Sequence, residues 1–217
     1  ENTPPAPFRA EYLAFRNGDE LGHTTLDLSD NHDGTWTLRS ETRGTLGLAK
    51  LAGMHIVETS HFRWRDGRPE AIEYDYRQDS AIKSRTRHAV FGNGEAHVEE
   101  GGKTFRYALV PGLIDRHAVT LAIAGDLKRG AQSFDYKVAV KDHVEDMRYE
   151  RAGDEKRRRG SGRARLAELN RVDMEVLAQQ RDANAGSRAF EVGEAVLAAV
   201  VVGELGPHLV DGELVHR

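Results

Sequence analysis

Hydrophobic and polar residues alternate along most of the chain between residues 8 and 155. In HIVETSHFRWR, for example, Ile56, Phe62 and Trp64 share one parity, and mostly polar residues take the other. Such alternation buries one face of a β-strand and leaves the opposite face in water. The sequence therefore predicts a mainly β protein whose strands each have one buried face.

Turn residues separate these alternating runs at short intervals. Gly, Asp or Asn stands in GDELG, DNHDG, RDGRP and GNG, and Asn-Gly is a strong signal for a β-hairpin. The runs between these turns predict roughly nine or ten antiparallel strands by residue 155. That number suits a strongly curved antiparallel sheet or an open, unclosed β-barrel.

One segment, PGLIDRHAVTLAIAGDLKRG, departs from the alternation. Its apolar residues recur at helical spacing, Asp115 stands where an N-cap belongs, and Gly130 stands where a C′ glycine belongs. We therefore expect a helix over residues 114–129. Because this helix is largely apolar, we expect it to cover the concave face of the sheet.

The 217 residues divide into three parts. Residues 1–7 are expected to be an extended N-terminus, and residues 8–155 form the curved β domain with the inserted helix. Residues 156–217 are expected to be a basic linker followed by a poorly defined, partly helical C-terminal extension. The longest apolar run, Ala195 to Val202, is far shorter than the roughly 20 residues that span a bilayer, so no transmembrane segment is expected. No export signal stands in this chain.

The composition of the chain argues against a nucleic-acid partner and excludes cysteine chemistry. The 31 Lys and Arg residues against 35 Asp and Glu residues give a net charge of −4, which does not favour a nucleic-acid partner. The basic run KRRRGSGRAR also lacks the interleaved aromatic residues that stack on bases. The chain has no cysteine, which excludes disulfides, thiolate nucleophiles and cysteine-bearing zinc sites. These features predict a soluble protein.

The ten histidines raise the question of a metal site. His55 with His61, or His88 with His97, would approach each other across paired strands. No HExxH motif and no close His-x-His spacing accompanies them, and DNHDG lacks the length and the closing Glu of a calcium loop. We therefore expect no metal and no cofactor.

No catalytic constellation stands out either. No GxSxG motif surrounds a serine, and Ser60 and Ser84 fall within expected strands. On a helix, Asp115, Arg116 and His117 would point about 100° apart, so we expect Asp115 to act only as a cap. We therefore expect the chain not to be an enzyme. Of three functional hypotheses, a hydrolase without an identifiable site is the least favoured.

The inward-facing aromatic residues are expected to be mainly core. If the helix fills the hollow of the sheet incompletely, they would also line an apolar ligand pocket. The candidates for this pocket are Trp36, Phe62, Trp64, Tyr74, Tyr76, Phe105, Tyr107, Leu121, Phe134 and Tyr136.

Four segments in this order, FRAEYLAFRNGDELGHTTLDL, IVETSHFRWRDGRPEAIEYDYR, PGLIDRHAVTLAIAGDLKRG and FDYKVAV, carry a family resemblance. Over residues 8–155 the chain resembles the bacterial family called domain of unknown function 3108. The tail after residue 155 departs from that family, which has a further strand pair there. The resemblance implies an exported, periplasmic protein of a Gram-negative cell envelope with no established activity.

These observations lead to two functional hypotheses. The first is a non-catalytic envelope protein that binds or carries a lipid or another apolar ligand in a half-barrel pocket. The alternative is a scaffold or assembly factor that binds an envelope protein through a sheet edge and the basic linker.

Overall fold

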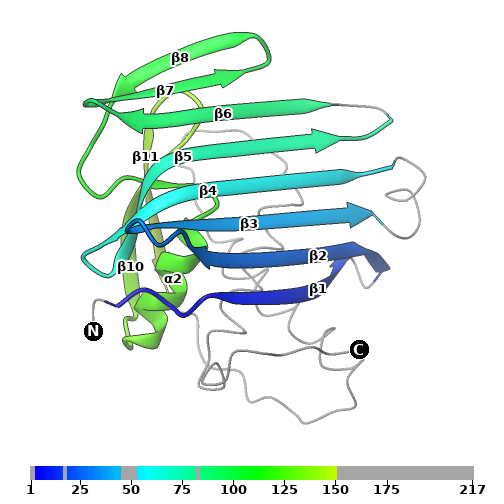
Figure 1. Ribbon diagram of the computed structural model, residues 1–217, viewed down its shortest axis with the longest axis horizontal. Coiled ribbons are helices and arrows are strands. Elements are labelled where there is room, and N and C mark those ends of the chain that lie inside the picture. The colour runs from blue at the N-terminus through cyan, green and yellow to red at the C-terminus, as the bar shows by residue number, and fades with distance from the viewer. Residues whose placement is uncertain (1–2, 17–18, 45–52, 82–83, 151–217) are drawn as a thin grey trace.

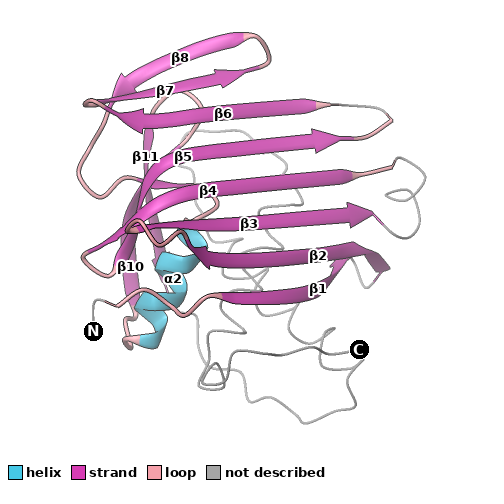
Figure 2. Cartoon of the chain, in the orientation of Figure 1, coloured by secondary structure: helices cyan, strands magenta, loops and turns pink. Residues whose placement is uncertain are grey.

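The computed structural model describes residues 3–16, 19–44, 53–81 and 84–150. Within them, eight strands form an antiparallel sheet in sequence order, β1 to β8, and three strands form a smaller sheet in the order β11-β10-β9 (Figures 1 and 2). The described residues also include one helix, α2, which contacts both sheets. The predicted basic linker and C-terminal extension, residues 156–217, lie outside the described residues.

The large sheet consists of β1 (Phe8–Arg16), β2 (Asp19–Asp30), β3 (Thr35–Gly44), β4 (His55–Arg65), β5 (Arg68–Asp79), β6 (Arg85–Gly92), β7 (Glu95–Glu100) and β8 (Lys103–Ala108). The remaining elements are β9 (Ile114–Asp115), α2 (Val119–Lys128), β10 (Ser133–Ala139) and β11 (Val144–Glu150).

Tight turns hold the long strands in register. Asp66 and Gly67 between β4 and β5, and Asn93 and Gly94 between β6 and β7, all have positive φ angles. Two consecutive residues of this kind make the type I′ turn, whose twist matches that of the flanking strands. The hairpins predicted from RDGRP and GNG are therefore confirmed.

The predicted fold class is also confirmed: the protein is mainly β, and its large antiparallel sheet is not closed into a barrel. Among the described strands, β1 and β8 each pair with only one neighbour, so both are edges. Two details differ from the prediction. The strands belong to two sheets, and β9 pairs with β10 in parallel, not antiparallel.

A bulge in β5 changes the predicted alternation, in which Ile72, Tyr74 and Tyr76 share one face. His61 pairs with Glu73 and Phe62 pairs with Ala71, so Ile72 has no partner across β4. An extra residue of this kind reverses the parity of the strand beyond it. Ile72 therefore does not share the buried face of Tyr74 and Tyr76, and Ala71 takes the buried position in its place.

The helix is shorter than predicted at its start. Residues 114 and 115 are drawn into strand pairing with Val138 and Ala139, and α2 begins at Val119 with Ala118 as its N-cap. Asp115 therefore does not cap the helix itself, although it caps the turn that leads into it. The predicted end is confirmed, because Gly130 follows the C-cap with a φ of 83°.

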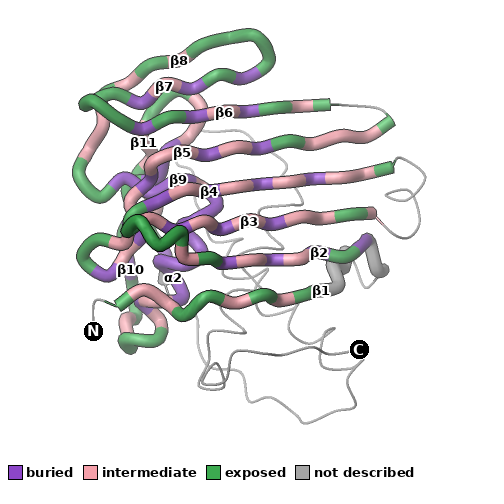
Figure 3. The backbone as a smooth tube through the Cα atoms, viewed as in Figure 1, coloured by how far each residue is buried: buried purple, intermediate pink, exposed green. Residues whose placement is uncertain are grey.

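The helix packs against the inner face of the large sheet at one end of the strands, where β10 and β11 cross behind them (Figure 1). Leu121 and Ala122 of α2 share a buried cluster with Leu38 of β3 and with Phe134 of β10. A second cluster lies under β4 to β7 and includes Ala139. Figure 3 shows buried residues at alternate positions along the long strands. Among the described residues, no helix has both the length and the apolar character required to cross a membrane.

Candidate functional site

The inner face of the large sheet changes character along the strands. The strand register aligns one row of buried residues across the sheet, here called the apolar row: Leu28, Leu38, Ser60, Tyr74, Ala89 and Val98. The next row is here called the mixed row: Leu26, Ser40, Glu58, Tyr76, Arg87 and Glu100. The same face therefore combines apolar and ionisable groups, two residues apart along each strand.

The charged groups of the mixed row are held by hydrogen bonds. Tyr74 donates to Glu58 Oε1 at 2.7 Å, and Arg87 Nε donates to Glu100 Oε2 at 2.8 Å. Arg85 Nε donates to the other oxygen of Glu100 at 2.7 Å. Burial opposes the ionisation of Glu100, but the two arginines outweigh it, so the pKa of Glu100 lies below its usual value. This end of the row carries two cations around one carboxylate.

The ten residues predicted to line a pocket fall into two clusters. The cluster around α2 contains six of them: Trp36, Phe62, Leu121, Phe134, Tyr136 and, partly buried, Trp64. The other cluster contains four: Tyr74, Tyr76 and, partly buried, Phe105 and Tyr107. The structure therefore does not bring the ten residues together at one place, and most of them are core residues.

Several tyrosine hydroxyl groups donate hydrogen bonds that connect different parts of the fold. Tyr74 donates to Glu58, Tyr136 donates to Asp126 Oδ2 at 2.6 Å, and Tyr107 donates to the backbone carbonyl of Val140 at 2.9 Å. Burial raises the pKa of Tyr107 to about 12. These phenols hold β5, β8 and β10 to their neighbours.

A buried polar cluster lies where the chain leaves β9 and enters α2. Ser60 of β4 donates to Asp115 Oδ1 at 2.7 Å, and its Oγ lies 2.9 Å from His117 Nδ1. The same Asp115 oxygen accepts the backbone N–H groups of His117 and Ala118 at 2.9 and 2.8 Å. Ser60, Asp115 and His117 are at most 2% exposed, and we call these three residues the Ser-Asp-His cluster.

The proton count in the Ser-Asp-His cluster follows from these contacts. Ser60 has one hydroxyl proton and gives it to Asp115, so His117 Nδ1 must carry the proton that lies between it and Ser60 Oγ. In the neutral imidazole, Nε2 of His117 is then an acceptor. Asp115 Oδ2 and His117 Nε2 are both buried, and neither has a hydrogen-bond partner in the part of the chain that the structure describes. Burial is the largest influence on both groups, raising the pKa of Asp115 and lowering that of His117.

This arrangement differs from that of a catalytic triad. In a triad the carboxylate orients the histidine and the histidine accepts the proton of the serine. Here Asp115 accepts that proton itself, and Ser60 is 0% exposed. The geometry does not prepare Ser60 to act as a nucleophile.

Sequence reasoning missed this cluster because it placed residues 115–117 on a helix, where their side chains would diverge. In the structure, Asp115 ends a strand and His117 lies in a turn, so both side chains reach Ser60. The Asp-x-His spacing just before the helix, with a serine at an inward strand position, was the available signal.

The two histidine pairs that were considered for a metal site, and set aside, have other partners in the structure. His55 and His61 lie on one strand, and they bind Glu41 and Thr37 respectively. His88 is paired with Glu99, whereas His97 is paired with Val90.

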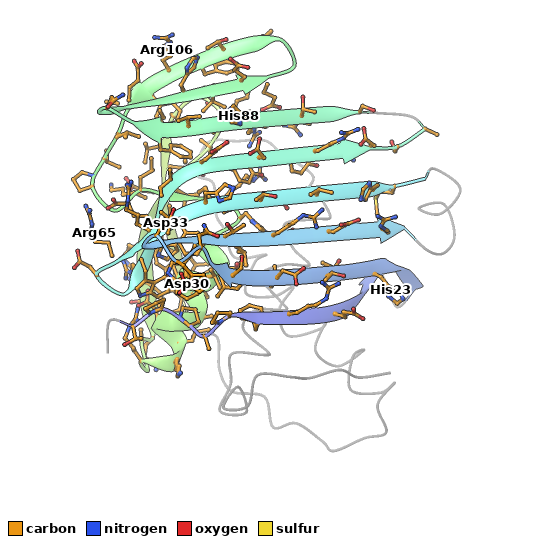
Figure 4. The ribbon with its side chains drawn as sticks, viewed as in Figure 1. His23, Asp30, Asp33, Arg65, His88 and Arg106 are labelled. Atoms are coloured by element: carbon orange, nitrogen blue, oxygen red, sulfur yellow. The ribbon has the colours of Figure 1, made fainter. Side chains whose placement is uncertain are left out.

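His88, labelled in Figure 4, instead lies on the outer face of the sheet, with its Nδ1 atom 2.8 Å from Asp75 Oδ1 and 3.8 Å from Glu73 Oε1. The ligand atoms of these three residues lie within 4.8 Å of one another, close enough to hold a metal ion. All three side chains are between 40 and 49% exposed. Asp75 and His88 also line a surface depression together with His55 and Asp79. The contacts are those of a solvated ion pair.

The DNHDG segment is a hairpin loop, as predicted. Asp30 accepts the backbone N–H of His32, and Asp33 accepts both the backbone N–H and the hydroxyl of Thr35. These hydrogen bonds, first that of the Thr35 side chain, lower the pKa of Asp33. Figure 4 labels Asp30 and Asp33 at this loop.

Comparisons with known proteins give limited similarity. No family model and no curated protein matches the chain. A solved structure described as a β-barrel-like protein of domain of unknown function DUF1849, from Brucella abortus, is similar with a TM-score of 0.40 and 13% identity. The similarity covers 68% of this chain and 67% of that chain. The resemblance to domain of unknown function 3108 stays a prediction.

Proposed function

We propose that the protein is a non-catalytic component of a Gram-negative cell envelope that binds a lipid or another amphiphilic molecule on the inner face of its large sheet. The observation that carries the proposal is the mixed row. Leu26 and Tyr76 contribute apolar side chains to this buried row, and Glu58, Arg87 and Ser40 contribute polar groups beside them on the same face. An amphiphile needs both kinds of surface within the length of one molecule.

The position of α2 supports this choice of surface. The helix and β10 lie behind one end of the long strands, and β2 to β5 extend beyond them (Figure 1). Beyond the mixed row the inner face continues with Thr24, Thr42 and Ile56, which the register aligns across β2, β3 and β4. Thr24 and Thr42 bond to each other at 2.8 Å, and Ile56, a member of the second buried cluster, is the apolar residue of this stretch proposed to contact an acyl chain.

Binding of a fluorescent fatty acid tests the proposal, together with native mass spectrometry after mild extraction. We expect Ile56→Ala to weaken fatty-acid binding roughly tenfold, because it removes an apolar contact worth about 0.8 kcal/mol for each methylene. The matched control is Val57→Ala, on the opposite face of the same strand, which should change the affinity less than twofold. A protein that always emerges without ligand and ignores the fatty acid would contradict the proposal, as would equal effects of the two variants.

A second candidate function rests on the two sheet edges. Among the described strands, β1 and β8 each leave one side unpaired, and such an edge can add a strand from a partner protein. Crosslinking in the envelope that captures one protein in equal stoichiometry, with no bound amphiphile, would favour a scaffold or assembly factor.

A periplasmic location is part of the same proposal and is tested separately. Expression from the native gene, followed by release of the periplasm by osmotic shock, should recover the protein in the periplasmic fraction. Recovery in the cytoplasmic fraction would contradict the periplasmic location. It would not affect the test of ligand binding.

A further inference from the structure

We propose that the Ser-Asp-His cluster is an acid-sensitive latch, in which protonation of His117 releases β9 and the start of α2 from β4. The inference concerns closure of the fold and does not depend on the proposed ligand.

The cluster joins two parts of the molecule that few other polar contacts join. Ser60 lies on the inner face of the large sheet, in the middle of the apolar row, and Asp115 and His117 are more than fifty residues later. Within the described side chains, both hydrogen bonds that link β4 to this turn end on Ser60 Oγ. Loss of that connection removes these side-chain hydrogen bonds between β4 and the turn. The turn is then held by the pairing of β9 with β10, by the bond from Ala71 N–H to the Leu113 carbonyl, and by packing.

In the closed state, a second proton on His117 would have no hydrogen-bond acceptor among the described residues. Nδ1 already carries a proton that it donates to Ser60, so the added proton must bind Nε2. That atom is buried, and none of the described residues offers it a hydrogen-bond partner. An unpaired buried N–H⁺ costs far more free energy than an exposed one. Opening of the turn, which lets water reach Nε2, removes that cost.

Three charged groups influence the protonation of His117. Glu58 of β4 and Asp115 of β9 favour the protonated imidazole, whereas Arg116 of the turn opposes it. Burial outweighs the two carboxylates, so the closed state holds the pKa of His117 below the usual 6.5. The open state therefore takes up the proton first as the pH falls below 6.5, and acid favours opening.

Asp115 acts in the opposite direction at lower pH. Its pKa is raised by burial, so the closed state binds a proton on Asp115 more readily than the open state does. Acid opening should therefore begin below pH 6.5 and level off where Asp115 becomes protonated. This two-step shape distinguishes the latch from general acid unfolding.

Amide hydrogen exchange of the full chain tests the latch. After correction for the intrinsic exchange rate, we expect the protection of residues 113–124 to fall by up to about tenfold per pH unit below 6.5, the limit for uptake of one proton. Protection of the central β3–β4 amides should stay constant over the same range. His117→Asn keeps a donor for Ser60 but cannot be protonated, and it should abolish the loss of protection on acidification, leaving only the opposite effect of Asp115. The matched control, His61→Asn on the outer face of β4, should leave the loss of protection unchanged.

Three results would overturn the latch: protection that does not change with pH, the same pH dependence in His117→Asn, or loss of β3–β4 protection in step with residues 113–124. If His117→Asn does not fold, the wild-type comparison of the two regions still decides. A pKa of His117 measured by NMR at or above the usual 6.5 would also overturn it.

Discussion

The two ends of α2 are each held by a buried carboxylate, but the two carboxylates are stabilised differently. At the start, Asp115 accepts only neutral donors, and one of its oxygens has no partner. At the end, Asp126 accepts from three side chains at 2.6 to 3.0 Å: Tyr136, Arg68 and Arg129. One end of the helix is therefore held by hydrogen bonds alone, and the other by ion pairs as well.

This difference decides the direction of each pKa shift. Burial raises the pKa of Asp115, because no cation faces it strongly enough to compensate. Burial also acts on Asp126, but Tyr136, Arg129 and Arg68 outweigh it and lower the pKa. The pKa values of two aspartates, one at each end of the same helix, are therefore shifted in opposite directions. A carboxylate near the C-terminal end of a helix also faces the negative end of the dipole, which Arg129 offsets.

The largest effect is expected from Asp126→Ala. This change removes the shared partner of Arg68, Arg129 and Tyr136, and Tyr136 keeps a buried hydroxyl without an acceptor. We expect a loss of about 3 kcal/mol in the free energy of unfolding, measured by urea denaturation at pH 7.5. Asp135→Ala, at an exposed position of β10, is the matched control and should change little. A loss below that of the Ser60 variant described next would contradict the comparison.

Ser60→Ala should cost less, about 1 to 2 kcal/mol at the same pH. It leaves His117 Nδ1 without an acceptor and removes one of three donors to Asp115 Oδ1, and an unsatisfied buried polar group has a cost of this size. Thr59→Ala, the neighbouring residue on the outer face, should stay within about 0.5 kcal/mol. Equal losses for the two variants would mean that the cluster does not hold the turn.

Local sequence signals predicted much of this fold. Alternation placed Phe62, Tyr74 and Phe134 on buried faces, and the Asn-Gly pair predicted its hairpin, because each depends on residues close together in the chain. Gly130 likewise marked the end of the helix through its own backbone preference.

The parts that could not be predicted depend on distant partners. Ile114 and Asp115 are drawn out of the helix by pairing with β10, about 24 residues later, and helix propensity cannot anticipate that pairing. The bulge at Ile72 depends on how β5 matches β4. The Ser-Asp-His cluster then follows from both, since Ser60 meets Asp115 only once β9 has formed.

The ion-paired end of α2 should respond to acid at lower pH than the latch. Because the pKa of Asp126 lies below 3.8, the stability that its charge contributes is fully present above pH 3.8 and is lost as the pH falls through the folded-state value. We expect the difference in unfolding free energy between wild type and Asp126→Asn to change by less than about 0.5 kcal/mol from pH 7 to pH 5, and then to shrink below pH 4. If the difference in unfolding free energy between wild type and Asp126→Asn already declined between pH 7 and pH 5, the two ends of α2 would not differ in their response to acid.

The smallest effect is expected on the outer face, where His88 makes a hydrogen bond as short as those of the buried cluster. Asp75 Oδ1 lies 2.8 Å from His88 Nδ1, but the histidine side chain is 45% exposed. Water replaces the lost contact at such a site, so His88→Gln should change the free energy of unfolding by no more than about 0.5 kcal/mol at pH 7.5. Urea denaturation beside Ser60→Ala measures the contrast directly. Equal losses would mean that contact distance, and not burial, sets the strength of the connections that hold α2.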